Sequence, residues 1–140
     1  MSTRSVSGEL YVGYEFPDLK KEPVTKVQIA KYAGASGDFN PLHLDPEVGL
    51  AAGVGGQIAH GMLVMGFAGQ AVTSWVPKKA LRRLKVRFTG MTRPGDVITV
   101  SGTITDLWQD NEKHIFKARI QARNQNDEAV LDGSFQAQAS

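Results

Sequence analysis

The sequence contains no cysteine among its 140 residues. This absence excludes disulfide bonds and thiolate metal sites, and it is compatible with a reducing cytoplasm. A long apolar run is also missing, because polar residues and glycines interrupt the most apolar stretch, 58–76. The first residues do not lead into the apolar core of a signal peptide. We therefore expect a cytoplasmic protein that has no membrane segment.

A strong net charge is missing as well. Lysine and arginine number 16 and aspartate and glutamate 14, which gives a formal net charge of +2. A balance this small does not indicate a nucleic-acid partner, although it allows an acidic one. The length fits a single domain over residues 1–140 that buries its own core, and residues 1–12 are expected to form a flexible arm.

Two helices are predicted in the first half of the chain. Thr25 is a good N-cap for a helix over about 26–35. The apolar face expected for this helix consists of Val27, Ile29, Ala30 and Ala33. Pro46 stands at a favourable first position for a second, short helix over 46–52.

The stretch 60–75 contains no proline, and it predicts a central helix that Pro77 ends. It is apolar nearly all round, which is typical of a buried helix. Gly66 and Gly69 inside it each cost about 1 kcal/mol relative to alanine. We expect these glycines to let a sheet approach the helix backbone closely.

The second half of the chain has the two-residue period of β-strands. Leu84, Val86 and Phe88 alternate with Arg83, Lys85 and Arg87. Further strands are expected within 97–108, 114–123 and 131–137, with Gly102 as a possible bulge. Long strands with short turns, preceded by one apolar helix, predict an α+β domain whose antiparallel sheet curls around that helix.

Three residues that can carry proton transfer lie close together between the first two helices. They are Asp38, Asn40 and His43. Gly37 weakens a helix and Pro41 favours an extended Asn40, so this segment is expected to be a loop. A carboxylate and an imidazole on one loop can share a water molecule, which suits the addition of water to an activated double bond or its removal.

A second motif, Ile58-Ala59-His60-Gly61-Met62, stands at the start of the predicted central helix. The backbone N–H of Gly61 would be one of the unpaired donors of a helix N-terminus, supported by the helix dipole. Glycine also allows a ligand to approach the backbone. A preorganised donor to a developing oxyanion is typically worth about 3 kcal/mol of the barrier.

Together, residues 32–45 and 58–62 resemble the hydratase motif of the MaoC-like hot-dog-fold family of (R)-specific enoyl-thioester hydratases and (3R)-hydroxyacyl dehydratases. Residues 63–76 are most similar to the catalytic subunit of the actinobacterial type of fatty acid synthase II (3R)-hydroxyacyl-carrier-protein dehydratase. The resemblance implies a single hot-dog fold, a five-stranded antiparallel sheet wrapped around a long central helix. It also implies a homodimer, or a heterodimer with another hot-dog subunit.

The resemblance further implies how the site works. Asp38 and His43 would activate water, and the Gly61 N–H would polarise the thioester carbonyl. The residues expected to bind or orient the substrate are Asn40, His60 and Met62. The substrate would be an acyl-CoA or acyl-carrier-protein thioester, with no metal or other cofactor and with neither nucleic acid nor membrane as a partner.

Several residues also have purely structural interpretations. Asp38 alone could cap a turn, Asp45 is expected to cap the short helix, and His60 is expected to hold the loop rather than to react. His43, Asp45 and His60 match no known metal motif. The basic cluster of Arg82, Arg83, Lys85 and Arg87 could be a solvated strand face, or it could meet a coenzyme A phosphate or an acidic carrier protein.

Two other functions stay open for such a chain. It could be a non-catalytic hot-dog subunit that holds an acyl chain for a partner, or a hot-dog thioesterase that cleaves the thioester. The complete set of Asp38, Asn40 and His43 favours the hydratase.

Overall fold

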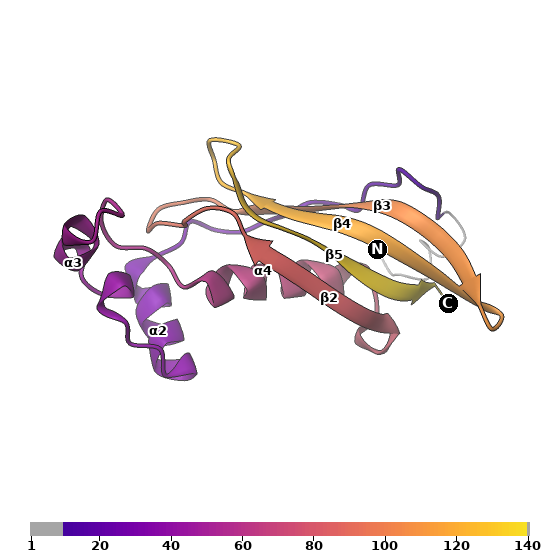
Figure 1. Ribbon diagram of the computed structural model, residues 1–140, viewed down its shortest axis with the longest axis horizontal. Coiled ribbons are helices and arrows are strands. Elements are labelled where there is room, and N and C mark those ends of the chain that lie inside the picture. The colour runs from indigo at the N-terminus through magenta and orange to yellow at the C-terminus, as the bar shows by residue number, and fades with distance from the viewer. Residues whose placement is uncertain (1–9, 140) are drawn as a thin grey trace.

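A computed structural model describes residues 10–139, so most of the arm predicted at 1–12 lies outside the described residues. The helical segments are α2 (Lys26–Ser36), η1 (Pro41–His43), α3 (Pro46–Ala51), α4 (Gly61–Trp75) and η2 (Lys78–Ala80). The strands are β1 (Leu19–Lys20), β2 (Leu81–Phe88), β3 (Thr99–Asp110), β4 (Lys113–Arg123) and β5 (Ala129–Ala139). Figure 1 shows these elements along the long axis of the molecule.

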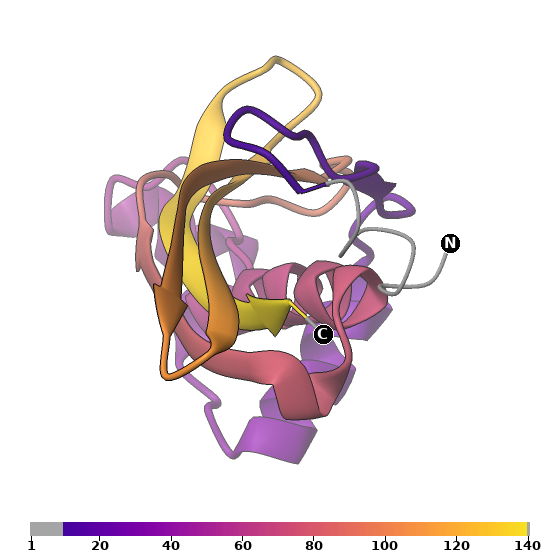
Figure 2. The same ribbon diagram turned by 90° about the vertical axis from the view of Figure 1, so that its right-hand side faces the viewer.

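The five strands form one antiparallel sheet in the order β1-β3-β4-β5-β2. The sheet curls around α4, as the end-on view in Figure 2 shows. This arrangement confirms the predicted hot-dog fold. The strand β2 follows α4 in sequence, yet it lies at the outer edge of the sheet beside β5, the last strand.

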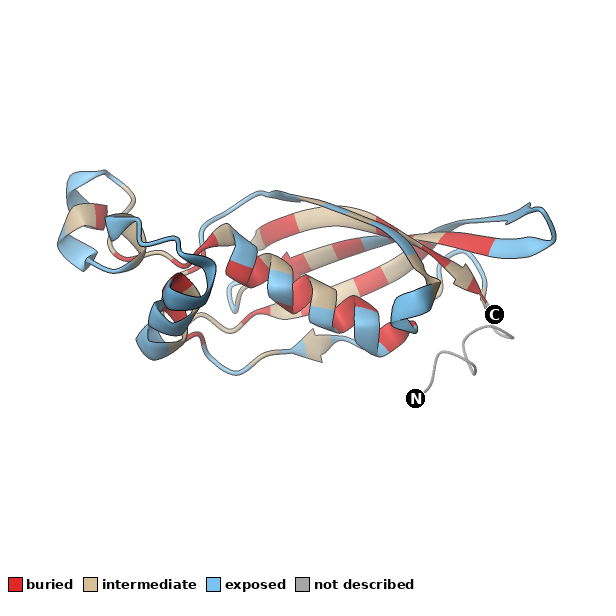
Figure 3. Ribbon diagram, turned by 90° about the horizontal axis from the view of Figure 1, so that it is seen from below, coloured by how far each residue is buried: buried red, intermediate tan, exposed pale blue. Residues whose placement is uncertain are grey.

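One face of α4 packs into the curled sheet (Figure 3). Its buried residues include Leu63, Phe67, Ala71 and Trp75, at helical spacing. The opposite face is exposed, so the helix is not buried on all sides as predicted. Gly66 lies on that exposed face, and a Cβ at Gly66 or Gly69 would meet nothing within 4 Å. The expectation that these two glycines admit the sheet was therefore wrong.

Close approach occurs instead at a glycine of the sheet. A Cβ at Gly102 would lie 2.6 Å from the ring of Trp75, so glycine there makes room for the indole. The ring is anchored because Trp75 Nε1–H donates to the Pro17 carbonyl at 2.7 Å. Gly102 is not the bulge, since the register of β3 shifts between Ile104 and Asp106.

Helix α2 begins and ends as predicted. The Thr25 hydroxyl accepts a hydrogen bond from Gln28 N at 2.9 Å, and Gly37 ends the helix in the left-handed conformation, φ 77°. The predicted apolar face is narrower than expected, because Ile29 is buried whereas Val27 is 64% exposed. Helices α2 and α3 lie beyond one end of the sheet, near the N-terminal end of α4 and the C-terminal end of β2 (Figure 1).

Candidate active site

The loop from Asp38 to His43 is held by its own polar side chains. The carboxylate of Asp38 accepts a hydrogen bond from Asn40 N at 3.2 Å. The side-chain oxygen of Asn40 in turn accepts from Leu42 N at 3.0 Å and caps η1. These short-range bonds are the Asx type that competes with helix continuation. They explain why the chain leaves helical geometry after Gly37.

An extended segment, Gln57 to Ala59, runs beside this loop and fixes its position. Gln57 Nε2 donates to the His43 carbonyl at 2.6 Å, and Ile58 N donates to the Leu42 carbonyl at 3.1 Å. On its other side, Ala59 N donates to the Thr92 carbonyl at 2.7 Å. The segment therefore ties the loop to the part of the chain that follows β2.

The imidazole of His43 has a defined tautomer. Its Nδ1 lies 2.9 Å from the Ile58 carbonyl oxygen, which can only accept, so Nδ1 carries the hydrogen. In the neutral ring Nε2 is then a free acceptor. It lies 4.0 Å from Asp38 Oδ2. That distance is too long for a direct hydrogen bond but fits one water molecule shared by both groups.

The two side chains differ in their access to solvent. The side chain of His43 is 13% exposed, whereas that of Asp38 is 54% exposed. A ligand or water can therefore reach the carboxylate from outside, while the imidazole stays at the base of the site. Both groups point to one place, as the proposed chemistry requires.

His60 holds the loop from behind. Its side chain is buried, and Nε2 lies 2.9 Å from the backbone carbonyl of Asp38, to which it donates. The His60 ring stacks on the His43 ring, with the two centroids 3.8 Å apart. The centroid of the Tyr32 ring lies 4.8 Å from that of His60. These contacts give His60 a positioning role for both Asp38 and His43.

Gly61 is the first residue of α4, and its N-cap His60 makes no side-chain cap hydrogen bond. Leu63 N donates to the His60 carbonyl at 3.1 Å, which leaves the N–H groups of Gly61 and Met62 as donors in the positive field of the helix dipole. A Cβ at Gly61 would lie 3.1 Å from the ring of Phe88, the last residue of β2. Only glycine lets this ring lie against the helix start without displacement.

Three apolar side chains that adjoin these polar groups in the chain or lie against Gly61 are exposed. Phe39 is 61% exposed, Met62 54% and Phe88 48%. Isolated exposed apolar residues are normal, but Phe39 adjoins Asp38 and Met62 adjoins Gly61 in the chain. The site therefore has an apolar border that an acyl chain or a second subunit could cover.

Sequence reasoning missed two residues of this site. Gln57 was missed because its partner, the His43 carbonyl, is 14 positions away. A polar residue directly before the apolar pair Ile58-Ala59 was the only local signal. Phe88 was seen as a core-facing strand residue, but its contact with Gly61 joins a strand end to a helix start that are far apart in sequence.

A metal ion could be considered at this site, because one ligand atom from each of Asp38, His43 and His60 lies within 4.8 Å of the other two. One feature makes them a poor set. The imidazoles are stacked with planes inclined by only 26°, so their in-plane lone pairs do not converge on one ion. The absence of a metal in the reaction stays a prediction.

Asp45 lies outside this group. Its carboxylate accepts a hydrogen bond from Glu47 N at 2.9 Å and caps α3, as predicted. Within the part of the chain that the structure describes, no helix is both long and apolar enough to cross a membrane.

Comparison with known proteins places the chain in a family. Residues 12–127 match the family described as "MaoC like domain". The sequence is 34% identical over 104 residues to a peroxisomal hydratase-dehydrogenase-epimerase of Neurospora crassa, covering 74% of this chain and 11% of that protein. It is 30% identical over 133 residues to enoyl-CoA hydratase ChsH3 of Mycobacterium tuberculosis, covering 93% of this chain and 44% of that protein. The chain thus spans less than half the length of these relatives.

Solved structures agree with the sequence comparison. The fold is similar to that of the unliganded (R)-hydratase PhaJ1 from Pseudomonas aeruginosa, with a TM-score of 0.80 and 25% sequence identity. The similarity covers 95% of this chain and 84% of that chain. Since the family match covers most of the sequence and the fold agrees with it, this protein belongs to the family of MaoC-like dehydratase domains.

Proposed function

We propose that this chain catalyses the reversible addition of water to trans-2-enoyl thioesters, giving (3R)-hydroxyacyl thioesters. The observation that carries the proposal is the 4.0 Å separation of His43 Nε2 and Asp38 Oδ2, with the His43 tautomer fixed by Ile58. Relatives named as enoyl-CoA hydratase and (R)-hydratase support this reaction class and its stereochemistry.

In the hydration direction, His43 Nε2 accepts a proton from the water molecule that it shares with Asp38. Asp38 accepts a hydrogen bond from the second hydrogen and so orients the oxygen toward the β carbon. The unperturbed pKa of an imidazole lies near neutrality, which suits a base that must also give its proton back. The fixed Nδ1–H to Ile58 bond keeps Nε2 directed at the water.

The electrons of the double bond move toward the thioester carbonyl as the new carbon–oxygen bond forms. The Gly61 N–H, at the positive end of α4, donates to the carbonyl oxygen on which charge develops. The enolate then takes up at the α carbon the proton that the Asp38–His43 pair removed from water. The Asp38–His43 pair delivers both parts of the water from the same side of the double bond, which gives syn addition, and dehydration is the same path reversed.

The remaining predicted site residues support this arrangement. Asn40 directs its backbone N–H at the Asp38 carboxylate and thereby orients it. His60 holds the Asp38 backbone. Met62 follows Gly61 and is 54% exposed, so we assign it to the border of the acyl path.

We further propose that the substrate is carried as a thioester of coenzyme A or of an acyl carrier protein. The chain would act as a homodimer or as a heterodimer with another hot-dog subunit. The exposed apolar border formed by Phe39, Met62 and Phe88 supports this, because a second chain would shield it from water. The closer kinship with the fatty acid synthase II dehydratase subunit stays a prediction.

One assay with crotonyl-CoA separates this reaction from the alternatives. Hydration removes the ultraviolet absorbance of the conjugated thioester without releasing free thiol. A thioesterase would release thiol, and a non-catalytic binding subunit would do neither. Loss of conjugation without thiol, with 3-hydroxybutyryl-CoA of R configuration as product, is the expected result. Release of thiol, or no reaction with crotonyl-CoA or a crotonyl-carrier protein, would contradict the proposal.

A further inference from the structure

A charged side chain outside the group described so far lies half-buried in the link between β2 and β3. The guanidinium of Arg93 donates through Nη2 to the Val54 carbonyl, and its Nη1 is buried without a hydrogen-bond partner among the described residues. No carboxylate of the described part lies within 4.0 Å of this guanidinium. Burying an unpaired charge costs free energy of folding, so stability alone does not account for an arginine here.

A glycine-rich loop encloses the guanidinium. A Cβ at Gly55 would lie 3.2 Å from Arg93 Nη2. The loop also lies directly against α3, because a Cβ at Gly49 would be only 1.8 Å from the Gly56 carbonyl oxygen. In addition, Val54 N donates to the Gly49 carbonyl at 3.0 Å. The loop is therefore held between the arginine and the short helix.

Two neighbouring residues hold both ends of the segment 54–59. At one end the Arg93 side chain binds the Val54 carbonyl. At the other end Ala59 N donates to the Thr92 carbonyl at 2.7 Å. Because Thr92 and Arg93 are adjacent in the sequence, one short piece of chain sets where the segment begins and where it ends.

The middle of this segment is the part that contacts His43. Gln57 Nε2 donates to the His43 backbone carbonyl at 2.6 Å, and the Ile58 carbonyl accepts from His43 Nδ1 at 2.9 Å. Loss of the Arg93 bond would leave the segment without its fixed point before Gln57. The Ile58 carbonyl could then move away from the imidazole.

The turn that contains Arg93 is itself fixed to the rest of the fold. Arg93 N donates to Asp96 Oδ2 at 2.8 Å, and Asp96 Oδ1 accepts from Gln125 Nε2 at 2.9 Å. Gly95 N donates to the Val24 carbonyl at 2.6 Å. These bonds join the turn to the connection between β4 and β5 and to the segment before α2. The guanidinium therefore binds the loop from a fixed position.

We propose that Arg93 is a positioning residue of the hydration site. It holds Val54 and thereby keeps the Ile58 carbonyl on His43 Nδ1, so that Nε2 stays free to accept the proton of the shared water. In this role Arg93 does not touch the substrate. The inference rests on the proposed function, and it names a residue on which the base of that reaction depends.

The expected effect follows from the two tautomers of neutral imidazole. With its hydrogen on Nδ1, the His43 ring can accept a proton at Nε2, and with its hydrogen on Nε2 it cannot. A displaced Ile58 carbonyl allows both tautomers to form. Turnover then falls with the fraction of the Nδ1–H tautomer, whereas substrate binding does not change.

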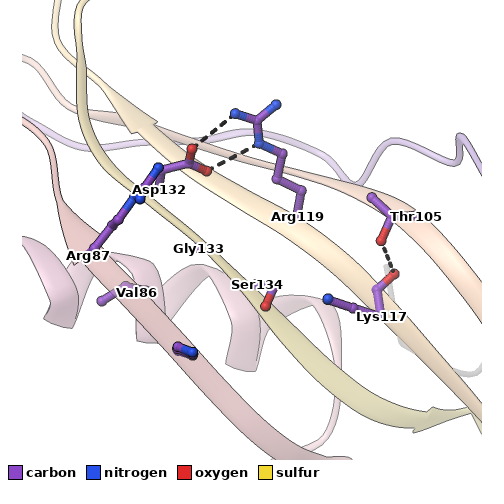
Figure 4. Close-up of a pocket in the computed structure, with 9 residues that line it drawn as sticks. Val86, Arg87, Thr105, Lys117, Arg119, Asp132, Gly133 and Ser134 are labelled. Carbon is purple, nitrogen blue, oxygen red and sulfur yellow. Dashed lines mark hydrogen bonds and ion pairs between the residues drawn. The ribbon is translucent and has the colours of Figure 1, made fainter.

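The test measures the tautomer and the turnover in the same proteins. The wild type, Arg93→Met and a control, Arg119→Met, are labelled with ¹⁵N in their three histidines. The control removes the same charge from the sheet face turned away from α4, where Arg119 binds Asp132 (Figure 4). The ring ¹⁵N signals are recorded at about pH 8.5, where an imidazole of ordinary pKa is neutral. The kinetic constants kcat and KM are measured with crotonyl-CoA.

The histidine signals provide their own controls. Those of His43 are assigned by their loss in His43→Gln. The exposed His114 is an internal reference whose signals the substitutions should not move.

In the wild type we expect His43 to carry its hydrogen on Nδ1 alone. In Arg93→Met a share of the Nε2–H tautomer should appear, and kcat should fall at least about fivefold while KM stays within about twofold. Arg119→Met should keep the wild-type tautomer and both kinetic constants within about twofold. A fall in kcat with an unchanged tautomer, a rise in KM alone, or wild-type values throughout in Arg93→Met would each overturn the positioning role.

Failure of the positioning role is distinct from failure of the proposed function, because the tautomer is measured without the reaction. If the wild type hydrates neither crotonyl-CoA nor a carrier-bound crotonyl group, the proposed function is wrong, and the spectra still show whether Arg93 holds His43. If the wild type is active and Arg93→Met changes neither tautomer nor kcat, the positioning role is wrong and the reaction stands. If circular dichroism shows that Arg93→Met does not fold, Arg93→Gln replaces it, with the same changes expected.

Discussion

His43 and His60 stack with ring centroids 3.8 Å apart, yet each is bonded to a different part of the chain. His43 donates to Ile58, and His60 donates to the backbone of Asp38. Asp38 and His43, which both lie on the loop, are thereby each hydrogen-bonded to the segment 58–60 that precedes α4. This exchange of hydrogen bonds fixes the carboxylate and the imidazole relative to each other and to the start of the helix.

The first prediction concerns the two groups that share the water. Asp38→Asn and His43→Gln should each lower turnover of crotonyl-CoA by at least about 100-fold, because each removes a group that handles a proton. Asp45→Asn is the matched control. Asparagine is as good an N-cap as aspartate, so α3 and activity should be kept. Near-normal turnover in either site variant, with folding confirmed by circular dichroism, would remove that residue from the mechanism.

The second prediction concerns Gln57, which positions His43 without touching the reacting atoms. Gln57→Leu removes the hydrogen bond to the His43 carbonyl and also a side-chain oxygen that is buried without a partner among the described residues. We expect kcat to fall by up to about tenfold, while KM stays near the wild-type value. The free energy of unfolding should stay within about 1 kcal/mol of wild type. Kinetics and urea unfolding measure both. A loss of stability with unchanged kcat would show a structural role only.

The third prediction concerns the start of α4. In Gly61→Ala the new methyl group would lie 3.1 Å from the Phe88 ring and would stand beside the donor amide. We expect kcat/KM to fall at least about tenfold through loss of carbonyl polarisation. Gly66→Ala in the same helix is the control, since a Cβ there meets nothing within 4 Å. It should keep full activity and raise the free energy of unfolding by about 1 kcal/mol.

A double variant separates two causes of this loss. If the methyl group acts only by pushing Phe88, Gly61→Ala/Phe88→Ala should recover activity relative to Gly61→Ala. If it blocks the approach of the thioester to the amide, as we expect, the double variant stays as impaired as the single one.

The fourth prediction concerns the contact between the helix and the sheet. Gly102→Ala would place a methyl group 2.6 Å from the Trp75 ring, which its hydrogen bond to Pro17 keeps from moving away. We expect a loss of about 1–3 kcal/mol in the free energy of unfolding, measured by urea denaturation. Gly34→Ala, in open space on α2, should not destabilise the protein. Equal stability of the two variants would contradict the packing described here.

Local patterns predicted much of the fold. Thr25, Gly37 and Pro77 mark the ends of helices, because caps and breakers act on neighbouring residues. The alternation in β2 is confirmed by burial, because Val86 packs against the core whereas Arg87 is exposed. These features need no knowledge of what lies across the molecule.

Contacts between distant segments were not predicted. Gly66 and Gly69 seemed to make room for the sheet, but only the three-dimensional packing shows that Gly102 has this task. For the same reason the sequence alone did not link Gln57 to His43 or Phe88 to Gly61. The spacing of Asp38 and His43 made them candidates, and the distance between their side chains is a result of the fold.

The most direct test is a crystal structure of the Asp38→Asn variant with bound crotonyl-CoA, in which slow turnover preserves the substrate. The account predicts that the thioester carbonyl oxygen lies about 3 Å from Gly61 N. It also predicts that the β carbon faces position 38 and His43 Nε2, with one water molecule between them. A carbonyl oxygen bound away from Gly61, or a β carbon turned from both side chains, would contradict it.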